Sequence, residues 1–344
     1  MNAVPPLQRL DSGVPANAVD EAETQETETE TEAASEVRTV VLAAAQHGQR
    51  IDRALAETIT EFSRSYLQQL LAQGAVQLNG KTVSKPALRV HAGDRVGVEM
   101  RPTLQSQAFR PESMDIDVVY EDAHLLVVNK PAGLVVHPAP GNWSGTLLNG
   151  LLGRDGAAGQ VPRAGIVHRL DKDTSGLMVV ARSRAAMDAL VAMIAQRSVV
   201  RQYVALAHRP WQGAVHRSVE APIGRDPRNR LRMAVVDLAQ HAGKPARTDF
   251  QCLEKAEAGC WVHCTLHTGR THQIRVHMAC MGHPLVGDTL YGGTPAAGML
   301  RQALHAARLA FTHPMTGEHL EFRSPLPADL QAALSAWGLR YNAP

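Results

Sequence analysis

A charged turn that leads directly into an apolar run, at residues 165–182, constrains this chain more than any other segment. The apolar part, residues 177–181, is a β-type run of Leu, Met, Val and Ala. The turn before it ends at Gly176 and places Asp171 beside three basic residues, His168, Arg169 and Lys172. This arrangement predicts a phosphate-binding surface with a potential nucleophile at its centre.

A turn of this composition raises three other interpretations, and the sequence argues against the first two. A calcium loop starting at Asp171 would need a bidentate glutamate at its twelfth position, which is Arg182, and a helix where the apolar run follows. An aspartyl-phosphate site needs further carboxylates for magnesium and a phosphate cradle, and the pattern G-x-x-x-x-G-K-S/T is absent. An ordinary solvated turn remains an alternative for this segment taken alone.

Charge is distributed unevenly along the 344 residues. Residues 1–37 contain nine acidic residues and one basic residue, a net charge of −8, which leaves +10 for the rest of a chain whose total is +2. Residues 21–32 alternate Glu with Thr and Ala and contain no large apolar side chain. We therefore expect residues 1–36 to be a disordered acidic tail, either inert or regulatory. The basic remainder is suited to a polyanion such as nucleic acid.

The four cysteines do not form a Cys-x-x-Cys pair. Cys260, His263 and Cys264 lie close together, but their alternation with apolar residues favours a partly buried strand over a zinc site. The N-terminus has no secretory signal, and no apolar run is long enough to span a bilayer. We therefore expect a cytoplasmic protein that binds no metal.

Residues 37–100 have the pattern of a small separate domain. Apolar residues at 51, 55 and 59, and again at 67, 70 and 71, predict two helices, the second capped by Ser63 and stopped at Gly74. Asn79-Gly80 between two short apolar runs predicts a β-hairpin. This order resembles the αL RNA-binding module of a small-subunit ribosomal protein, which implies RNA phosphate contacts by Arg53, Arg64 and Lys81. A solvated basic face is the alternative for each of them.

Residues 101–112 contain two prolines and no periodicity, and we expect a linker there. A catalytic domain is then expected over residues 113–339, followed by a short tail at 340–344. Its further motifs are Lys-Pro-Ala-Gly at 130–133, Arg-Gln-Tyr-Val-Ala at 201–205 and a long polar motif at 266–277, which continues in Gly-Asp-x-x-Tyr-Gly at 287–292. We expect a helix ending near Gly282, with His272 and Arg275 on one face. Together with the Asp171 turn, these motifs resemble the pseudouridine synthases of the RluA/RluD type. That family implies an α+β fold with a mixed, largely antiparallel sheet and a basic central cleft.

The resemblance implies a role for each candidate site residue. Asp171 is the catalytic carboxylate, acting as a base or as a nucleophile, with Arg275 as its charge partner, although Arg270 could exchange roles with Arg275. Tyr203 stacks on the target base and takes part in proton transfer. Arg169 fills the gap left by a flipped base, and the other RNA-binding residues are His168, Arg270 and His272.

The expected function is the isomerisation of specific uridines to pseudouridine in large-subunit ribosomal RNA by a monomeric enzyme. The reaction requires no metal, redox change or other cofactor. Two alternatives stay open: a non-catalytic RNA-binding factor in ribosome assembly, and a pseudouridine synthase that acts on transfer RNA.

Overall fold

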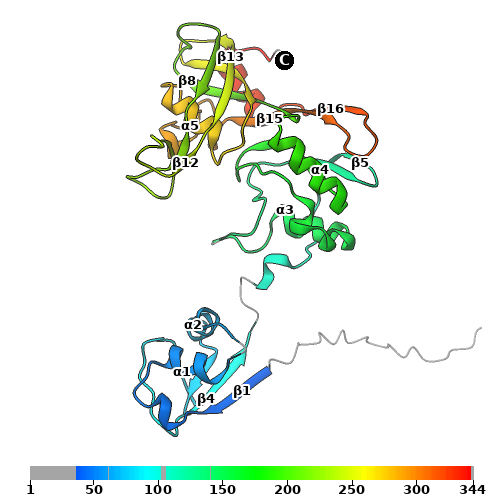
Figure 1. Ribbon diagram of the computed structural model, residues 1–344. Coiled ribbons are helices and arrows are strands. Elements are labelled where there is room, and N and C mark those ends of the chain that lie inside the picture. Colours follow the sequence, from blue (N-terminus) through cyan, green and yellow to red (C-terminus); the bar gives the residue numbers. More distant parts are fainter. Residues whose placement is uncertain (1–35, 61, 102–105, 140, 342–344) are drawn as a thin grey trace, which may run out of the picture. The chain divides into compact units, whose positions relative to one another are not determined.

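The computed structural model describes residues 36–60, 62–101, 106–139 and 141–341. The chain divides into two compact units, Met1–Arg101 and Pro102–Pro344 (Figure 1). The expected disordered tail lies outside the described residues except for Glu36, which instead begins the first strand.

The first unit is a four-stranded antiparallel sheet with two helices. Its strands lie in the order β1-β4-β2-β3. The predicted hairpin is confirmed, with Asn79 and Gly80 both at positive φ (49° and 80°), and Ser63 accepts a hydrogen bond from the backbone of Tyr66 at the start of the second helix. The elements are β1 Glu36–Val41, α1 Ile51–Thr58, α2 Arg64–Ala72, β2 Val76–Leu78, β3 Lys81–Thr82 and β4 Arg95–Met100.

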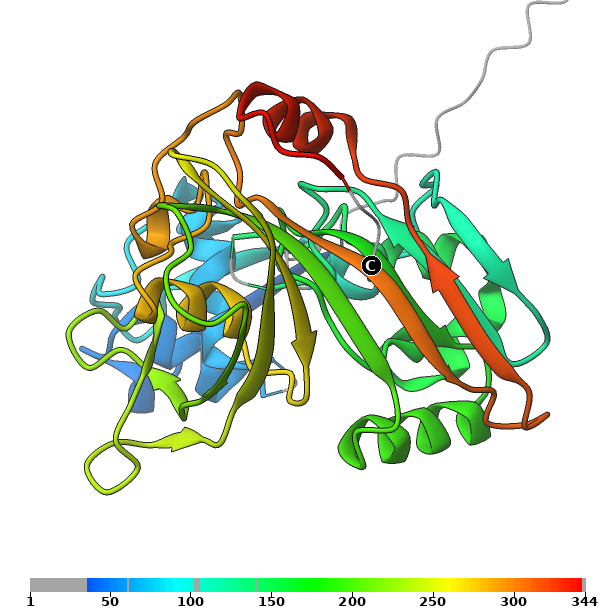
Figure 2. The same ribbon diagram turned by 90° about the horizontal axis from the view of Figure 1, so that it is seen from above.

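The second unit is built on a nine-stranded mixed sheet (Figure 2). Eight strands follow the order β5-β6-β7-β15-β8-β14-β13-β9, and β16 also pairs with β15. All neighbours are antiparallel except β7 and β15, so the predicted mixed, largely antiparallel fold is confirmed. The strands are β5 Val118–Glu121, β6 Leu125–Lys130, β7 Ser175–Ala181, β8 Val200–His208, β9 His216–Glu220, β13 Arg247–Lys255, β14 Gly259–Leu266, β15 Leu304–Thr312 and β16 His319–Arg323.

Helices cover both faces of this sheet, and side-chain alternation decides which residues they meet. On β7, Leu177 and Val179 pack with the helix α4 Arg184–Ala195, while Met178 and Val180 pack in the cluster that contains α3 Leu147–Arg154. Successive residues of a strand point to opposite faces, so both faces of β7 are buried. The predicted apolar strand is therefore confirmed and lies in the interior.

The same alternation operates at strand β8. Tyr203 and Ala205 belong to the core cluster that includes α5 Gln273–Cys280, whereas Val204 and Leu206 belong to the cluster that includes α6 Ala328–Ala336. Cys260 and Cys264 lie in β14 and are buried, as the strand interpretation predicted. Tyr203 and α5 thus share one face of the sheet, and the candidate site forms there.

The expected linker is wrong over its second half. Residues Ser106–Phe109 form a short 3₁₀ helix, and the Asn149 side chain at the start of α3 donates to the carbonyl of Arg110 (2.9 Å). Glu112 donates its backbone N–H to the carbonyl of Asn149, so this segment is part of the second unit. The two prolines and the lack of periodicity predicted a linker. Hydrogen bonds to a helix 39 residues away leave no pattern in the local sequence, so they could not be predicted.

A small antiparallel sheet, which the sequence did not predict, lies between β9 and β13 in the chain. It consists of β10 Ile223–Arg225, β11 Met233–Val235 and β12 Gly243–Lys244, in the order β11-β10-β12. Strand β11 packs against α5. Within the described part of the chain, no helix is long and apolar enough to cross a membrane.

Candidate active site

A cavity of about 450 Å³ opens on the face of the sheet that carries Tyr203 and α5. Most of its wall comes from three segments far apart in the sequence: the turn before β7, the start of β8, and residues 266–275. All three predicted motifs therefore contribute side chains to one hollow. Asp171 is the single carboxylate among the described residues that line it.

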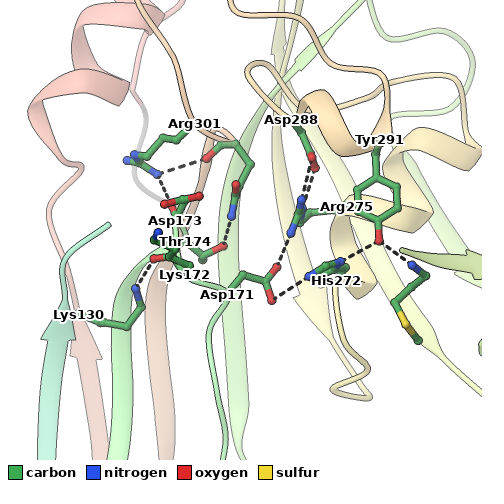
Figure 3. Close-up of polar contacts among 12 residues, drawn as sticks. Lys130, Asp171, Lys172, Asp173, Thr174, His272, Arg275, Asp288, Tyr291 and Arg301 are labelled. Carbon is green, nitrogen blue, oxygen red and sulfur yellow. Dashed lines mark hydrogen bonds and ion pairs between the residues drawn. The ribbon is translucent and has the colours of Figure 1, made fainter. Parts of the chain in front are cut away.

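Asp171 is held by an arginine that is itself fixed by a second carboxylate (Figure 3). The guanidinium of Arg275 donates from Nη1 to Asp171 Oδ2 at 3.0 Å, and from Nε and Nη2 to the two oxygens of Asp288 at 2.7 and 2.8 Å. Arg275 is buried, and although burial opposes its charge, the two carboxylates raise its pKa above the ordinary value. The guanidinium is thus permanently charged, with one edge directed at Asp171.

The other oxygen of Asp171 is left open. The ring of His272 lies beside it, with Nε2 3.9 Å from Oδ1, beyond hydrogen-bonding distance. Among the described residues nothing donates to Oδ1, and the Asp171 side chain retains 15% of its exposure on the wall of the cavity. One oxygen is therefore anchored, and the other can reach a ligand.

His272 is positioned by backbone geometry rather than by a helix face. It was expected to share a helical face with Arg275, but α5 begins only at Gln273, and His272 has the left-handed φ of 57°. Its Nδ1 lies 2.7 Å from the hydroxyl of Tyr291, which accepts the backbone N–H of Met233 on β11. Burial lowers the pKa of His272, so the ring is held neutral beside the carboxylate.

The backbone that presents Asp171 is clamped by a buried lysine. Lys130, at the end of β6, is 1% exposed and donates to the carbonyls of Pro131, Leu134 and Lys172 at 2.7 to 2.9 Å. Burial lowers the pKa of Lys130 to about 8, so it is still charged at neutral pH. Three carbonyl acceptors satisfy the three donors of an ammonium group, and the clamp is complete.

Two further contacts fix the turn after Asp171. Arg301 donates to the carbonyl of Asp173 (2.9 Å) while its other edge pairs with Asp329. Gly176 has a φ of 113°, and a Cβ there would lie 2.3 Å from the carbonyl oxygen of Ala306 on β15. Only glycine allows β7 to approach β15 so closely.

Tyr203 and His168 line the cavity as neutral groups. Burial raises the pKa of Tyr203 to about 12, so its phenol keeps its proton. Burial lowers the pKa of His168 to about 3, and its Nε2 accepts the backbone N–H of Val179 (3.1 Å). His168 therefore bonds to the interior of strand β7, and the RNA contact suggested by the sequence stays a prediction.

The remaining predicted arginines of this unit differ in their surroundings. Arg169 is exposed at the edge of the cavity. Arg270 also lines the cavity, but its Nε donates to the carbonyl of Pro245 (3.0 Å), away from Asp171. Of the two arginines proposed as charge partners, the structure places Arg275 against Asp171.

Comparison with known proteins agrees with this geometry. The profile of a family described as RNA pseudouridylate synthase matches residues 124–280, and that of the S4 domain matches residues 49–96. The chain is 49% identical over 301 residues to the ribosomal large subunit pseudouridine synthase D of Neisseria meningitidis serogroup A, covering 84% of this chain and 78% of that protein. The chain belongs to the RNA pseudouridylate synthase family.

Two other similarities support the assignment. An RNA pseudouridine synthase named YlyB from Bacillus subtilis is 45% identical, covering 83% of this chain and 93% of that protein. The solved structure of human RNA pseudouridylate synthase domain containing 1 has a TM-score of 0.50 at 28% identity, covering 68% of this chain and 90% of that chain. The protein is thus an enzyme, an RNA pseudouridine synthase. The residues matched by the family profile include Asp171, Tyr203 and Arg275.

The three RNA contacts predicted in the first unit of the synthase have different surroundings. Arg64 donates to Asp52 Oδ2 from Nε and Nη2 (3.1 and 2.8 Å), and Arg53 pairs with Glu57 at 3.0 Å. Lys81 is exposed on β3. Arg64 is therefore already committed to a buried carboxylate, a partner that the sequence reasoning did not anticipate.

Several functional residues of the synthase were missed from the sequence. Asp288 and Tyr291 were recognised as part of a motif but were given no role, and Lys130 was noted only beside a proline. Their signal was weak because each acts through a contact with a residue that is distant in the chain. The glycines next to Asp288 and Tyr291 did mark a tight turn, which is where polar side chains are often fixed.

Proposed function

We propose that this enzyme isomerises specific uridines of large-subunit ribosomal RNA to pseudouridine, with Asp171 as the catalytic carboxylate. The observation that carries the proposal is the Asp171–Arg275 pair of 3.0 Å at the wall of a cavity lined by arginines. One anchored oxygen and one open oxygen suit a carboxylate that must react with a bound nucleotide.

The reaction is an internal rearrangement of one nucleotide. The bond from N1 of uracil to the sugar breaks, the base rotates, and C5 forms the new bond to the same sugar carbon while its proton is lost and N1 gains one. Asp171 starts this sequence, either by taking a proton from the sugar or by attacking it. The charge of Arg275 favours the ionised form of Asp171 in both routes.

Arg275 is in turn positioned by its neighbours. Asp288 occupies two of its donors, and the Tyr291 ring lies 5.0 Å from the guanidinium carbon. Because Arg275 and Asp288 are both buried, the guanidinium needs no reorganisation when a substrate arrives. Asp288 and Tyr291 are therefore positioning residues for the charge partner of Asp171.

Tyr203 stacks on the flipped base, and Arg169 fills the gap that the base leaves in the RNA. Tyr203 offers a neutral ring for stacking, and with a pKa of about 12 it can donate a proton but not accept one at neutral pH. Arg169 is exposed two residues before Asp171 and its planar guanidinium suits the gap left in the RNA when the uridine is flipped out. Flipping costs about a few kcal/mol, which contacts of this kind offset.

The substrate follows from the relatives and the first unit. Several relatives are named for the ribosomal large subunit, and the S4 domain supplies a separate basic surface, including Arg53 and Lys81, for structured RNA. We infer that the enzyme works as a monomer in the cytoplasm, where ribosomal RNA is modified. Transfer RNA is the alternative substrate.

The test is a nucleotide-resolution pseudouridine map of large-subunit ribosomal RNA, free and in assembling subunits, and of transfer RNA, each incubated with the enzyme. We expect new pseudouridines at a few defined positions in the ribosomal RNA and none with the Asp171→Asn variant. New pseudouridines only in transfer RNA would assign the alternative substrate. No new pseudouridine in either RNA or in assembling subunits would contradict the proposal.

A further inference from the structure

Arg201 is a buried cation for which the described part of the protein provides no counter-charge. It lies on β8, is 5% exposed, and its Nε is buried without a hydrogen-bond partner. No carboxylate or carbonyl among the described residues forms an ion pair or hydrogen bond with its guanidinium. An uncompensated buried charge is costly, so such a group is kept where a ligand completes it.

The surroundings of Arg201 direct it into the cavity of the candidate site. It lines that cavity together with Tyr203, which is two residues further along β8 and therefore on the same face of the sheet. On the Asp171 turn, burial lowers the pKa of His168, and the charge of Arg201 lowers it further. The groups next to Arg201 are thus neutral and cannot balance its charge.

Gly269 leaves the room that the guanidinium occupies. A Cβ at this position would lie 2.9 Å from Nη1 of Arg201, so the end of this flexible side chain would have to shift to make room for it. The φ of Gly269 is not in the left-handed region, so its backbone conformation does not require glycine. The absence of a side chain at Gly269 thus leaves the guanidinium in its observed place without strain.

From these observations we infer that Arg201 binds a backbone phosphate of the RNA, next to the nucleotide whose base stacks on Tyr203. The inference rests on the proposed function, because it takes RNA as the ligand of the cavity. A phosphate brings the negative charge that the site lacks, which a base carbonyl would not, and it matches the planar donor fork of arginine. Tyr203 and Arg201 are about 6.6 Å apart along the strand, so base and backbone can be held at the same time.

Neutralising single phosphates tests the contact directly. RNA affinity is measured in the Asp171→Asn background with oligonucleotides that carry one methylphosphonate at each position around the target uridine. We expect one position to weaken binding about tenfold or more, since a charge-assisted hydrogen bond is lost. Adding Arg201→Met should remove the sensitivity at that position and preserve it elsewhere. Arg184→Met, an exposed arginine outside the cavity, is the matched control and should change no position.

Thermal unfolding of the free protein separates ligand binding from a structural role. Arg201→Met removes an uncompensated buried charge, so its melting temperature should equal or exceed that of the parent protein. A melting temperature that falls, or an Arg201→Met map that keeps every phosphate sensitivity, would overturn the inference. Affinity for oligonucleotides with thio-substituted uracil carbonyls is measured in the same way as for the methylphosphonates. If Arg201→Met removed only the sensitivity to that substitution, Arg201 would contact the base, and the inference would also be overturned.

Pseudouridine formation by the unmodified enzyme on the same oligonucleotides keeps this test apart from the proposed function. If the enzyme forms no pseudouridine, the proposed function fails although the phosphate map can still be read. If it forms pseudouridine and the map is unchanged by Arg201→Met, only the inference about Arg201 fails.

Discussion

Two of the carboxylates that pair with arginines, Asp52 and Asp171, differ in how completely their oxygens are occupied. Asp52, in the first unit, is fully buried and accepts hydrogen bonds from Arg50, Arg64 and Gln68. Asp171, in the second unit, accepts one from Arg275 and keeps an oxygen open toward the cavity. A carboxylate with all its acceptor positions filled holds a fold together, whereas one with an open position can react.

The surroundings of the two arginines differ in the same sense. Arg64 is half-exposed at 49%, and among the described residues its guanidinium bonds only to Asp52, so the buried carboxylate fixes the position of the arginine. Arg275 is buried and is fixed by Asp288 before it reaches Asp171, so here the arginine organises the carboxylate. The direction of this dependence distinguishes a structural pair from a pair prepared for chemistry.

The largest expected effect is that of Asp171→Asn on turnover. The amide has nearly the same shape but is neither a base nor a nucleophile, so the rate of isomerisation should fall by about 10³-fold or more. RNA affinity should stay within about tenfold, and thermal unfolding should not change. Single-turnover assays measure the rate, and Asp173→Asn in the same turn is the matched control. Turnover close to that of the parent enzyme would remove Asp171 from the catalytic role.

Arg275→Met should produce the next largest loss, about a hundredfold in turnover, because Asp171 loses its charged donor. Since Asp288 would be left buried and unpaired, the double variant Arg275→Met/Asp288→Asn serves to keep the protein folded. Arg270→Met is the control, and its turnover should fall much less. If Arg270→Met proves to be the more damaging change, the roles of the two arginines are reversed.

Asp52→Asn should affect stability rather than chemistry, with a loss of about 2 kcal/mol in the unfolding free energy of the first unit. Burial alone would raise the pKa of Asp52, but the hydrogen bonds from Arg50, Gln68 and Arg64 bring it well below its ordinary value of 3.8. Because folding lowers the pKa, this stabilisation is present above about pH 4 and is lost as the pH falls further. Denaturant titrations at pH 7 and pH 3 should therefore show a difference between parent and variant that shrinks in acid.

The smallest effect concerns the exposed basic residues of the first unit. Lys81→Met should lower the magnitude of the slope of log K against log[salt] by about 0.7–0.9, the value for one phosphate contact. Arg53→Met should lower it less, because its charge is already shared with Glu57. Binding isotherms at several salt concentrations give the slopes. Equal slopes for the parent and Lys81→Met would place Lys81 outside the RNA contact.

Sequence reasoning predicted the elements whose signals are local. The apolar run after Gly176, the Asn79-Gly80 hairpin and the capped helix after Ser63 were all predicted because each depends on neighbouring residues. Strand β1 was not predicted, since it is formed by pairing with β4 nearly 60 residues later. The 3₁₀ turn inside the expected linker was missed for the same reason.

The candidate site shows the same limit. The sequence could nominate Asp171 and two arginines, but it could not choose between Arg270 and Arg275, because the choice depends on where α5 begins. It placed His272 on a helical face, whereas the left-handed backbone at this residue brings the ring toward Asp171. It could not predict that Arg64 binds Asp52, because nothing in the local pattern connects residues that are twelve positions apart on different helices.

The most direct test of the account is a double-variant cycle between the two carboxylates. Asp52→Asn, Asp171→Asn and the double variant are each measured for unfolding free energy and for single-turnover rate at saturating RNA. We expect the double variant to combine the unfolding free energy of Asp52→Asn with the single-turnover rate of Asp171→Asn, since the effects of substitutions at independent sites are additive. If Asp52→Asn alone slows the saturated reaction as much as Asp171→Asn does, the division between a structural and a reactive carboxylate is wrong.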